Sequence, residues 1–149
     1  MTRLWFLNGL VTIGVAHRDG VDGISVLEHL APHGDSPPLH VHRDEDEVFH
    51  VLEGELRFRV GEDERRAGPG ETLLAPQGVP HTYRVESATA RWLVTTTRGK
   101  FERFVRSISR PAERDGLPEV APVPTPEQVE ALGAASSLHG IELVGPPLT

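Results

Sequence analysis

The sequence predicts an all-β fold, and the expected architecture is a jelly-roll β-barrel with short C-terminal helices. Three observations support it. Short apolar segments recur through the first two thirds of the chain, Gly, Pro and Asp residues separate them at even spacing, and helical spacing begins only near residue 100. Many short strands with turn signals between them are typical of a β-sandwich or barrel. A jelly-roll barrel is favoured because closure removes exposed strand edges.

The expected strands follow from the positions of the turn residues. Residues 10–15 and 24–30 form the first two, with Asp-Gly turns between them. A Gly- and Pro-rich loop follows, from Pro32 to Pro38. The remaining expected strands are 39–42, 46–52, 55–60, 64–67, 71–75, 80–86 and 90–97.

Beyond residue 99 the apolar spacing becomes helical. Apolar residues stand at i, i+3, i+4 and i+7 from Phe101, which predicts a helix that Pro111 ends. Thr125 then begins a second helix, with a proline in its first turn and Gln128 three residues after the cap. This helix runs to about residue 138, and Gly140 is its expected stop.

We expect a single domain in two parts. Residues 1–110 form the barrel with its flanking strands and the first helix. Residues 111–149 form a Pro-rich connection and the C-terminal helix, packed on the barrel. A chain of 149 residues is long enough for one sizeable core.

Composition limits the class of partner. The net charge is −7, with one lysine against fourteen arginines, and no basic cluster is present. These features argue against nucleic acid and against an anionic membrane surface as partners. No apolar run reaches the roughly 18 residues of a membrane span, and the N-terminal run is too short for a secretory signal. We therefore expect a cytoplasmic protein.

The chain has no cysteine, which excludes disulfides, thiolate metal ligands and a cysteine nucleophile. Six of the eight histidines lie between residues 29 and 81. His40 and His42 are two apart on an expected strand, so both point to one face. With Glu47 and with His81 from a later strand, they form a set of three imidazoles and one carboxylate. This set suits one divalent transition metal, namely iron, manganese, nickel, cobalt, copper or zinc.

Each part of this set is unremarkable alone. Two histidines on a strand occur by chance, the acidic run before Glu47 is more often a solvated loop, and a single His81 is more often a half-buried surface residue. The order and the intervals of the residues carry the prediction.

The intervals resemble the two motifs of the cupin family. From Gly34 to Gly54 the chain reads G, five residues, HxH, four residues, E, six residues, G. From Gly70 to His81 it reads G, five residues, PxG, two residues, H. The family usually has Asn where this chain has Val85. The resemblance implies a metal held by four ligands, His40, His42, Glu47 and His81, and it implies that Gly54, Gly70 and Gly78 form turns.

A finer resemblance concerns bacterial single-domain cupins described as quercetin 2,3-dioxygenase-like. It rests on residues 5–9, 37–40, 99–104 and 139–147. This resemblance implies a mononuclear metal that activates a flavonol or another enol-type substrate toward dioxygen. It also implies a homodimer, since related barrels often pair.

Strand parity predicts what lines the interior. Phe49 and Val51 share the inward parity of Glu47, whereas His50 points outward. Tyr83 shares the parity of His81, and we expect it to bind a substrate or oxygen; filling of the barrel is an equal alternative. On strand 90–97 either Trp92 and Val94 or Leu93 and Thr95 face inward. An apolar interior with a metal anchor suits a small aromatic or enol-type substrate.

Histidines outside the set are expected at the surface, and this group contains His17, His29, His33 and His139. The helix with Phe101 and Phe104 is expected to pack on the sheet as plain core. Its alternative role is a wall or lid of the pocket.

The leading hypothesis for function is a dioxygenase that acts on a small aromatic or enol-type substrate. In it the metal lowers the pKa of a substrate hydroxyl, and Glu47 accepts the proton. An oxygen-independent isomerase, cyclase or lyase would use the same centre. A non-catalytic small-molecule-binding protein is the third alternative, and the sequence does not separate the three.

Overall fold

The computed structural model describes residues 1–149 and contains two antiparallel β-sheets that face each other. The strands and helices are β1 (Thr2–Phe6), β2 (Gly9–Val15), η1 (His17–Asp19), β3 (Ser25–Pro32), β4 (Leu39–His42), β5 (Glu47–Glu53), β6 (Leu56–Val60), β7 (Asp63–Ala67), β8 (Thr72–Ala75), β9 (His81–Val85), β10 (Thr89–Thr96), α1 (Lys100–Ile108), β11 (Arg110–Pro111), α2 (Pro126–Leu138) and β12 (Ile141–Gly145). The predicted all-β class with two short helices is confirmed.

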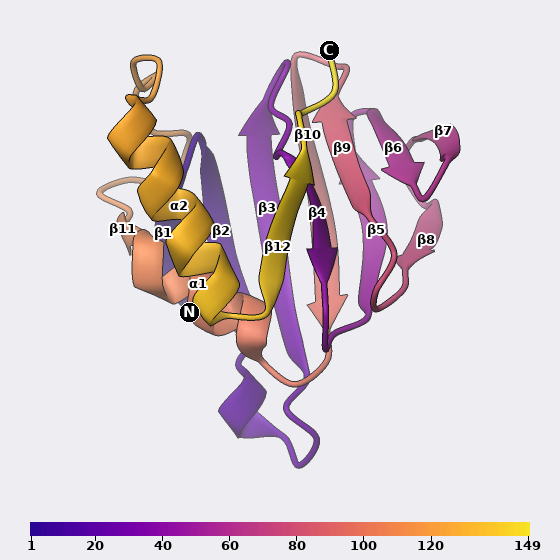
Figure 1. Cartoon of the computed structure of the whole chain (residues 1–149), viewed down its shortest axis with the longest axis vertical. Helices are drawn as coiled ribbons and strands as arrows, with labels where there is room; N and C mark the ends of the chain where they lie inside the picture. The colour runs from indigo at the N-terminus through magenta and orange to yellow at the C-terminus, as the bar shows by residue number, and fades with distance from the viewer.

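The order of the strands is that of a jelly roll, because several neighbours in the sheets, such as β3 and β10 or β4 and β9, are distant in the chain. The larger sheet runs β11-β1-β2-β3-β10-β5-β8, and the smaller sheet runs β12-β4-β9-β6-β7. Figure 1 shows β12 beside β4, with α1 and α2 at the side where β1 and β2 lie. Neither α1 nor α2 has the length and apolar character of a membrane-spanning helix.

Alternation along the strands builds the main core between the sheets. On β5, Phe49 and Val51 are buried and the residues on either side of each are not, as parity predicts. On β10 the structure selects Trp92 and Val94 as the inward pair. Phe58 on the smaller sheet meets Phe49 on the larger, with ring centroids 5.2 Å apart. The barrel is therefore filled at this end.

The sequence did not predict three of the strands. β1, β11 and β12 carry too few alternating residues for the pattern to register, and β11 has two residues. β12 matters for function because it pairs with β4 in register, Ile141 opposite His42 and Leu143 opposite His40. The second predicted helix ends as expected, and Gly140 follows it with φ of 75°.

Two buried glutamates fix α1 in place. The carboxylate of Glu45 accepts hydrogen bonds from the backbone N–H groups of Lys100 (3.1 Å) and Phe101 (2.8 Å). These bonds satisfy backbone donors at the start of the helix. Gly99, the N-cap residue, has no side chain that could do so. Glu102 accepts a hydrogen bond from Ser25 Oγ at 2.6 Å. The helix is thus tied both to the β4–β5 loop and to the start of β3.

Candidate metal centre

The structure brings together all four residues predicted as metal ligands. One donor atom from each lies within 4.8 Å of those of the others, and all four side chains are buried or nearly so. His81 Nε2 is 2.7 Å from Glu47 Oε2, and His42 Nε2 is 3.2 Å from the same oxygen. The members of the cluster are His40, His42, Glu47 and His81.

The cluster spans both sheets. β4 presents His40 and His42 on one face because they are two residues apart. β9 pairs with β4 at His40 and His81, which places the two imidazole centroids 4.5 Å apart. Glu47 comes from the first residue of β5, in the opposite sheet. A ligand held here would therefore connect the two layers of the barrel.

Backbone carbonyls orient two of the rings. His40 Nδ1 donates to the carbonyl of Pro38 at 2.7 Å, and His81 Nδ1 donates to that of Val79 at 3.3 Å. An imidazole that donates through Nδ1 presents Nε2 as a ligand atom. Both nitrogens of His42 are buried and form no hydrogen bond, although Nε2 lies 3.2 Å from the Glu47 carboxylate. A buried polar atom without a hydrogen bond is costly. These ring orientations and the unbonded nitrogens of His42 fit a metal ion.

Burial and mutual contact set the charges of the cluster. Burial alone would raise the pKa of Glu47, but the neighbouring imidazoles of His42 and His81 lower it to about 2. Burial, with the repulsion of the other two imidazoles, lowers the pKa of His40 to about 3. At neutral pH the centre thus offers an ionised carboxylate and a neutral imidazole from His40, which are the forms that bind metal.

The acidic run before Glu47 is not the solvated loop that its composition alone would indicate. Asp44 pairs with the ammonium group of Lys100 at the start of α1. Glu45 is buried and caps the same helix. The Asp46 carboxylate accepts a hydrogen bond from the backbone N–H of Gln77 at 2.8 Å. The loop is therefore held on both sides, and this fixes the direction in which Glu47 enters the barrel.

A cavity of about 440 Å³ opens beside the cluster, within the size range of small-molecule sites. Its walls are mostly apolar and come from both sheets, both helices and the C-terminal segment. His40, His42 and Glu47 lie on its surface, and so do Phe49, Trp92 and Phe101. Phe101 and Phe104 line this cavity, as the alternative role of a wall predicts. Core packing, the preferred prediction, also holds, because Phe104 is buried and Phe101 packs against both hydrophobic clusters.

His29 is not at the surface, contrary to the prediction. It is 5% exposed and lines the cavity. The error arose because His29 has no partner at metal-ligand spacing in the sequence. The alternation of β3, in which every second residue is buried, was the signal that pointed inward. His33, by contrast, is exposed, as predicted.

Tyr83 also lines the cavity. Its ring packs among Phe58, Phe49 and Trp92, with centroid distances from 5.1 to 6.2 Å. Burial raises the pKa of the Tyr83 phenol well above its usual value, so the hydroxyl stays protonated and able to donate. Val85, where the family usually has Asn, lies in the core between the sheets.

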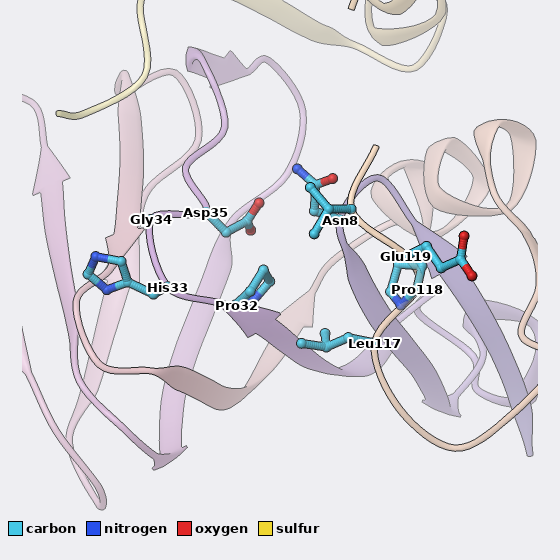
Figure 2. Close-up of a pocket in the computed structure, with 9 residues that line it drawn as sticks. Asn8, Pro32, His33, Gly34, Asp35, Leu117, Pro118 and Glu119 are labelled. Atoms are coloured by element: carbon cyan, nitrogen blue, oxygen red, sulfur yellow. The ribbon is translucent and has the colours of Figure 1, made fainter. Parts of the chain in front are cut away.

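A second, more polar pocket of about 330 Å³ lies outside the first. Figure 2 shows Asn8 and Asp35 at this pocket, with Leu117 and Pro118 from the segment after β11. Asn8 and Asp35 line both pockets. Burial raises the pKa of the Asp35 carboxyl to about 6, against the opposing effect of a hydrogen bond with Asn8.

The fold has counterparts among known proteins. Residues 26–96 match the family described as "Cupin domain", and this stretch contains all four clustered residues. This stretch is similar to a cupin domain, and the two-sheet architecture is that of the cupin fold.

Solved structures support the same class. An RmlC-like cupin from Shewanella frigidimarina superposes with a TM-score of 0.59 at 17% identity, over 69% of this chain and 89% of that one. The polyketide cyclase RemF from Streptomyces resistomycificus gives a TM-score of 0.57 at 23% identity, over 65% of this chain and 74% of that one. At such identities the likeness concerns the fold alone.

One curated relative is similar in sequence. Quercetin 2,3-dioxygenase of Bacillus subtilis (strain 168) is 31% identical over 100 residues. The match covers 66% of this chain but only 30% of the length of that enzyme. It therefore relates this chain to a minor part of the relative.

Proposed function

We propose that this protein is a metal-dependent dioxygenase of the quercetinase-like type that acts on a small aromatic or enol-type substrate. The observation that carries the proposal is a buried set of three imidazoles and one carboxylate at the wall of an apolar cavity. The similarity to quercetin 2,3-dioxygenase supports the choice of substrate class.

The proposed centre consists of His40, His42, Glu47 and His81 around one divalent ion. Such an ion, when bound, acts as a Lewis acid that lowers the pKa of a substrate hydroxyl and brings substrate and oxygen together. The apolar walls exclude water and favour a planar, uncharged ring system over a sugar.

Two side chains have proposed roles toward the substrate. Glu47 is ionised at neutral pH, lies at the edge of the cavity and accepts the proton of the substrate hydroxyl. Tyr83 keeps its proton and donates a hydrogen bond to an oxygen of the ligand. Both groups are held in fixed orientations by packing, which lowers the cost of positioning the substrate.

Metal content is the first test. After loading with iron, manganese, nickel, cobalt, copper or zinc and dialysis, we expect about one ion per chain in the wild type and near none in His42→Ala. His50→Ala is the matched control, because His50 lies on β5 but faces away from the cavity and bonds Thr72 Oγ1. Equal metal in wild type and His42→Ala would refute the centre.

Oxygen uptake is the second test. The metal-loaded protein is mixed with flavonols and other aromatic enols in an oxygen electrode, and uptake is expected from the wild type and from His50→Ala but not from His42→Ala. Conversion of substrate without oxygen uptake would favour the isomerase, cyclase or lyase alternative. A protein that takes up no metal would favour a non-catalytic binding role.

A further inference from the structure

His29 is a buried polar residue that the metal centre does not use. Its ring stacks on those of Trp92 and Phe101. The ring centroids are 5.3 and 6.1 Å apart, and the interplanar angles are 20° and 13°. Phe6 meets the ring edge-on at 6.2 Å. The imidazole is therefore fixed in orientation by aromatic side chains from β1, β10 and α1.

The polar atoms of this ring stack lack partners. His29 Nε2 and Trp92 Nε1 are both buried without a hydrogen bond. The two residues are opposite each other in the β3–β10 register, and both line the cavity. A buried donor or acceptor without a partner costs about 1–3 kcal/mol. A hydrogen bond to an oxygen atom of a ligand in the cavity would remove this cost.

Burial also keeps the ring uncharged. It lowers the pKa of His29 to about 4, although Glu47 opposes the shift. A neutral imidazole has one donor and one acceptor nitrogen, so its natural partner is a hydroxyl group, which can also both donate and accept. The indole N–H of Trp92 only donates, and it suits the same hydroxyl or a nearby carbonyl oxygen.

We propose that His29 is a positioning residue that hydrogen-bonds a second oxygen of the substrate, distinct from the oxygen at the His40, His42, Glu47 and His81 cluster. This inference rests on the proposed function, because it assumes an aromatic or enol-type ligand in the cavity. It narrows the substrate class to planar compounds with at least one hydroxyl or carbonyl oxygen remote from the metal-binding oxygens.

The test compares two ligands that share metal-binding oxygens. 3-Hydroxyflavone has the hydroxyl and carbonyl pair alone, whereas quercetin adds remote hydroxyl groups. Dissociation constants are measured with zinc-loaded protein, so that binding is read without turnover. We expect His29→Phe to weaken quercetin binding about tenfold, the equivalent of one hydrogen bond, and to change 3-hydroxyflavone binding less than about threefold.

A second variant separates hydrogen bonding from stacking. His29→Gln retains a donor and an acceptor but removes the aromatic ring, so it should keep most of the preference for quercetin. It also serves if His29→Phe does not fold. Zinc content should equal that of the wild type in both variants, because His29 is not one of the four clustered residues.

Several results would overturn the assignment of His29. These are an equal effect of His29→Phe on both ligands, no effect on either ligand, loss of zinc from the variants, or no binding of either ligand by the wild type. The absence of oxygen uptake has a different meaning. If the wild type takes up no oxygen but His29→Phe still loses the preference for quercetin, the dioxygenase proposal fails and the role of His29 stands.

Discussion

At the scale of single residues, burial decides which side chains are charged and therefore what each can do. Asp35 is the clearest case outside the metal centre. It lies between the two pockets, and burial raises the pKa of its carboxyl from 3.8 to about 6. The folded protein therefore binds a proton at this site between about pH 4 and 6, where the unfolded chain has released it.

The consequence is a loss of stability as pH rises through that window, because the folded state then binds more protons than the unfolded state. Asp35→Asn removes the ionisation, retains an amide that Asn8 can bond, and should be more stable than the wild type by about 1–3 kcal/mol at pH 8. Urea unfolding at pH 4 and pH 8 measures the difference. A gain of equal size at both pH values would show that the ionisation of Asp35 is not its cause.

The sequence predicted residues whose partners lie at recognisable intervals and missed those whose partners are set by the fold. His40, His42 and Glu47 lie within eight residues, so strand geometry indicates a common point. The roles of His29 and Glu45 depend on α1, more than 50 residues away in the chain. No local pattern records such a contact.

At the scale of elements, two glycines in similar turns differ in what surrounds them. Gly54 and Gly70 have φ of 82° and 86°, a conformation that side chains rarely adopt. A Cβ atom on Gly54 would lie 2.5 Å from the carbonyl oxygen of Thr89, whereas one on Gly70 would meet nothing within 4 Å. The turn after β5 is thus both strained and crowded for any other residue.

The two positions give a matched pair of substitutions. Gly70→Ala should cost only the backbone strain, about 1–2 kcal/mol, and Gly54→Ala should cost several kcal/mol because β10 must also move. Denaturant unfolding of the two variants beside the wild type gives both values. Equal losses would mean that close packing against β10 is not what constrains Gly54.

The elements that the sequence predicted best are those with strong alternation or clear caps. β5 and β10 bury alternate residues, and α2 begins at the Thr125 and Gln128 capping box. The choice of inward face on β10 needed the structure, because Trp92 and Leu93 are both apolar and the pattern alone fits either phase. β12 escaped prediction because it is an edge strand in which only Ile141 is fully buried.

At the scale of the whole molecule, the candidate metal centre gathers residues from both sheets. Glu47 belongs to the larger sheet, and the three histidines belong to two strands of the smaller one. Within the smaller sheet, β4 pairs with β9 at His40 and His81, the position of the centre itself. An ion bound there would link the two sheets and reinforce the joint between β4 and β9.

A metal that binds only the folded protein should therefore stabilise the whole domain. A ligand at one hundred times its dissociation constant contributes about 2.7 kcal/mol, which corresponds to roughly 5–10 °C in the melting temperature of a chain of this size. Thermal unfolding with chelator and with added zinc or manganese measures the shift. His50→Ala should show the shift of the wild type, and His42→Ala should show little. A full shift in His42→Ala would place the stabilising ion elsewhere, because that variant lacks one of the four clustered side chains.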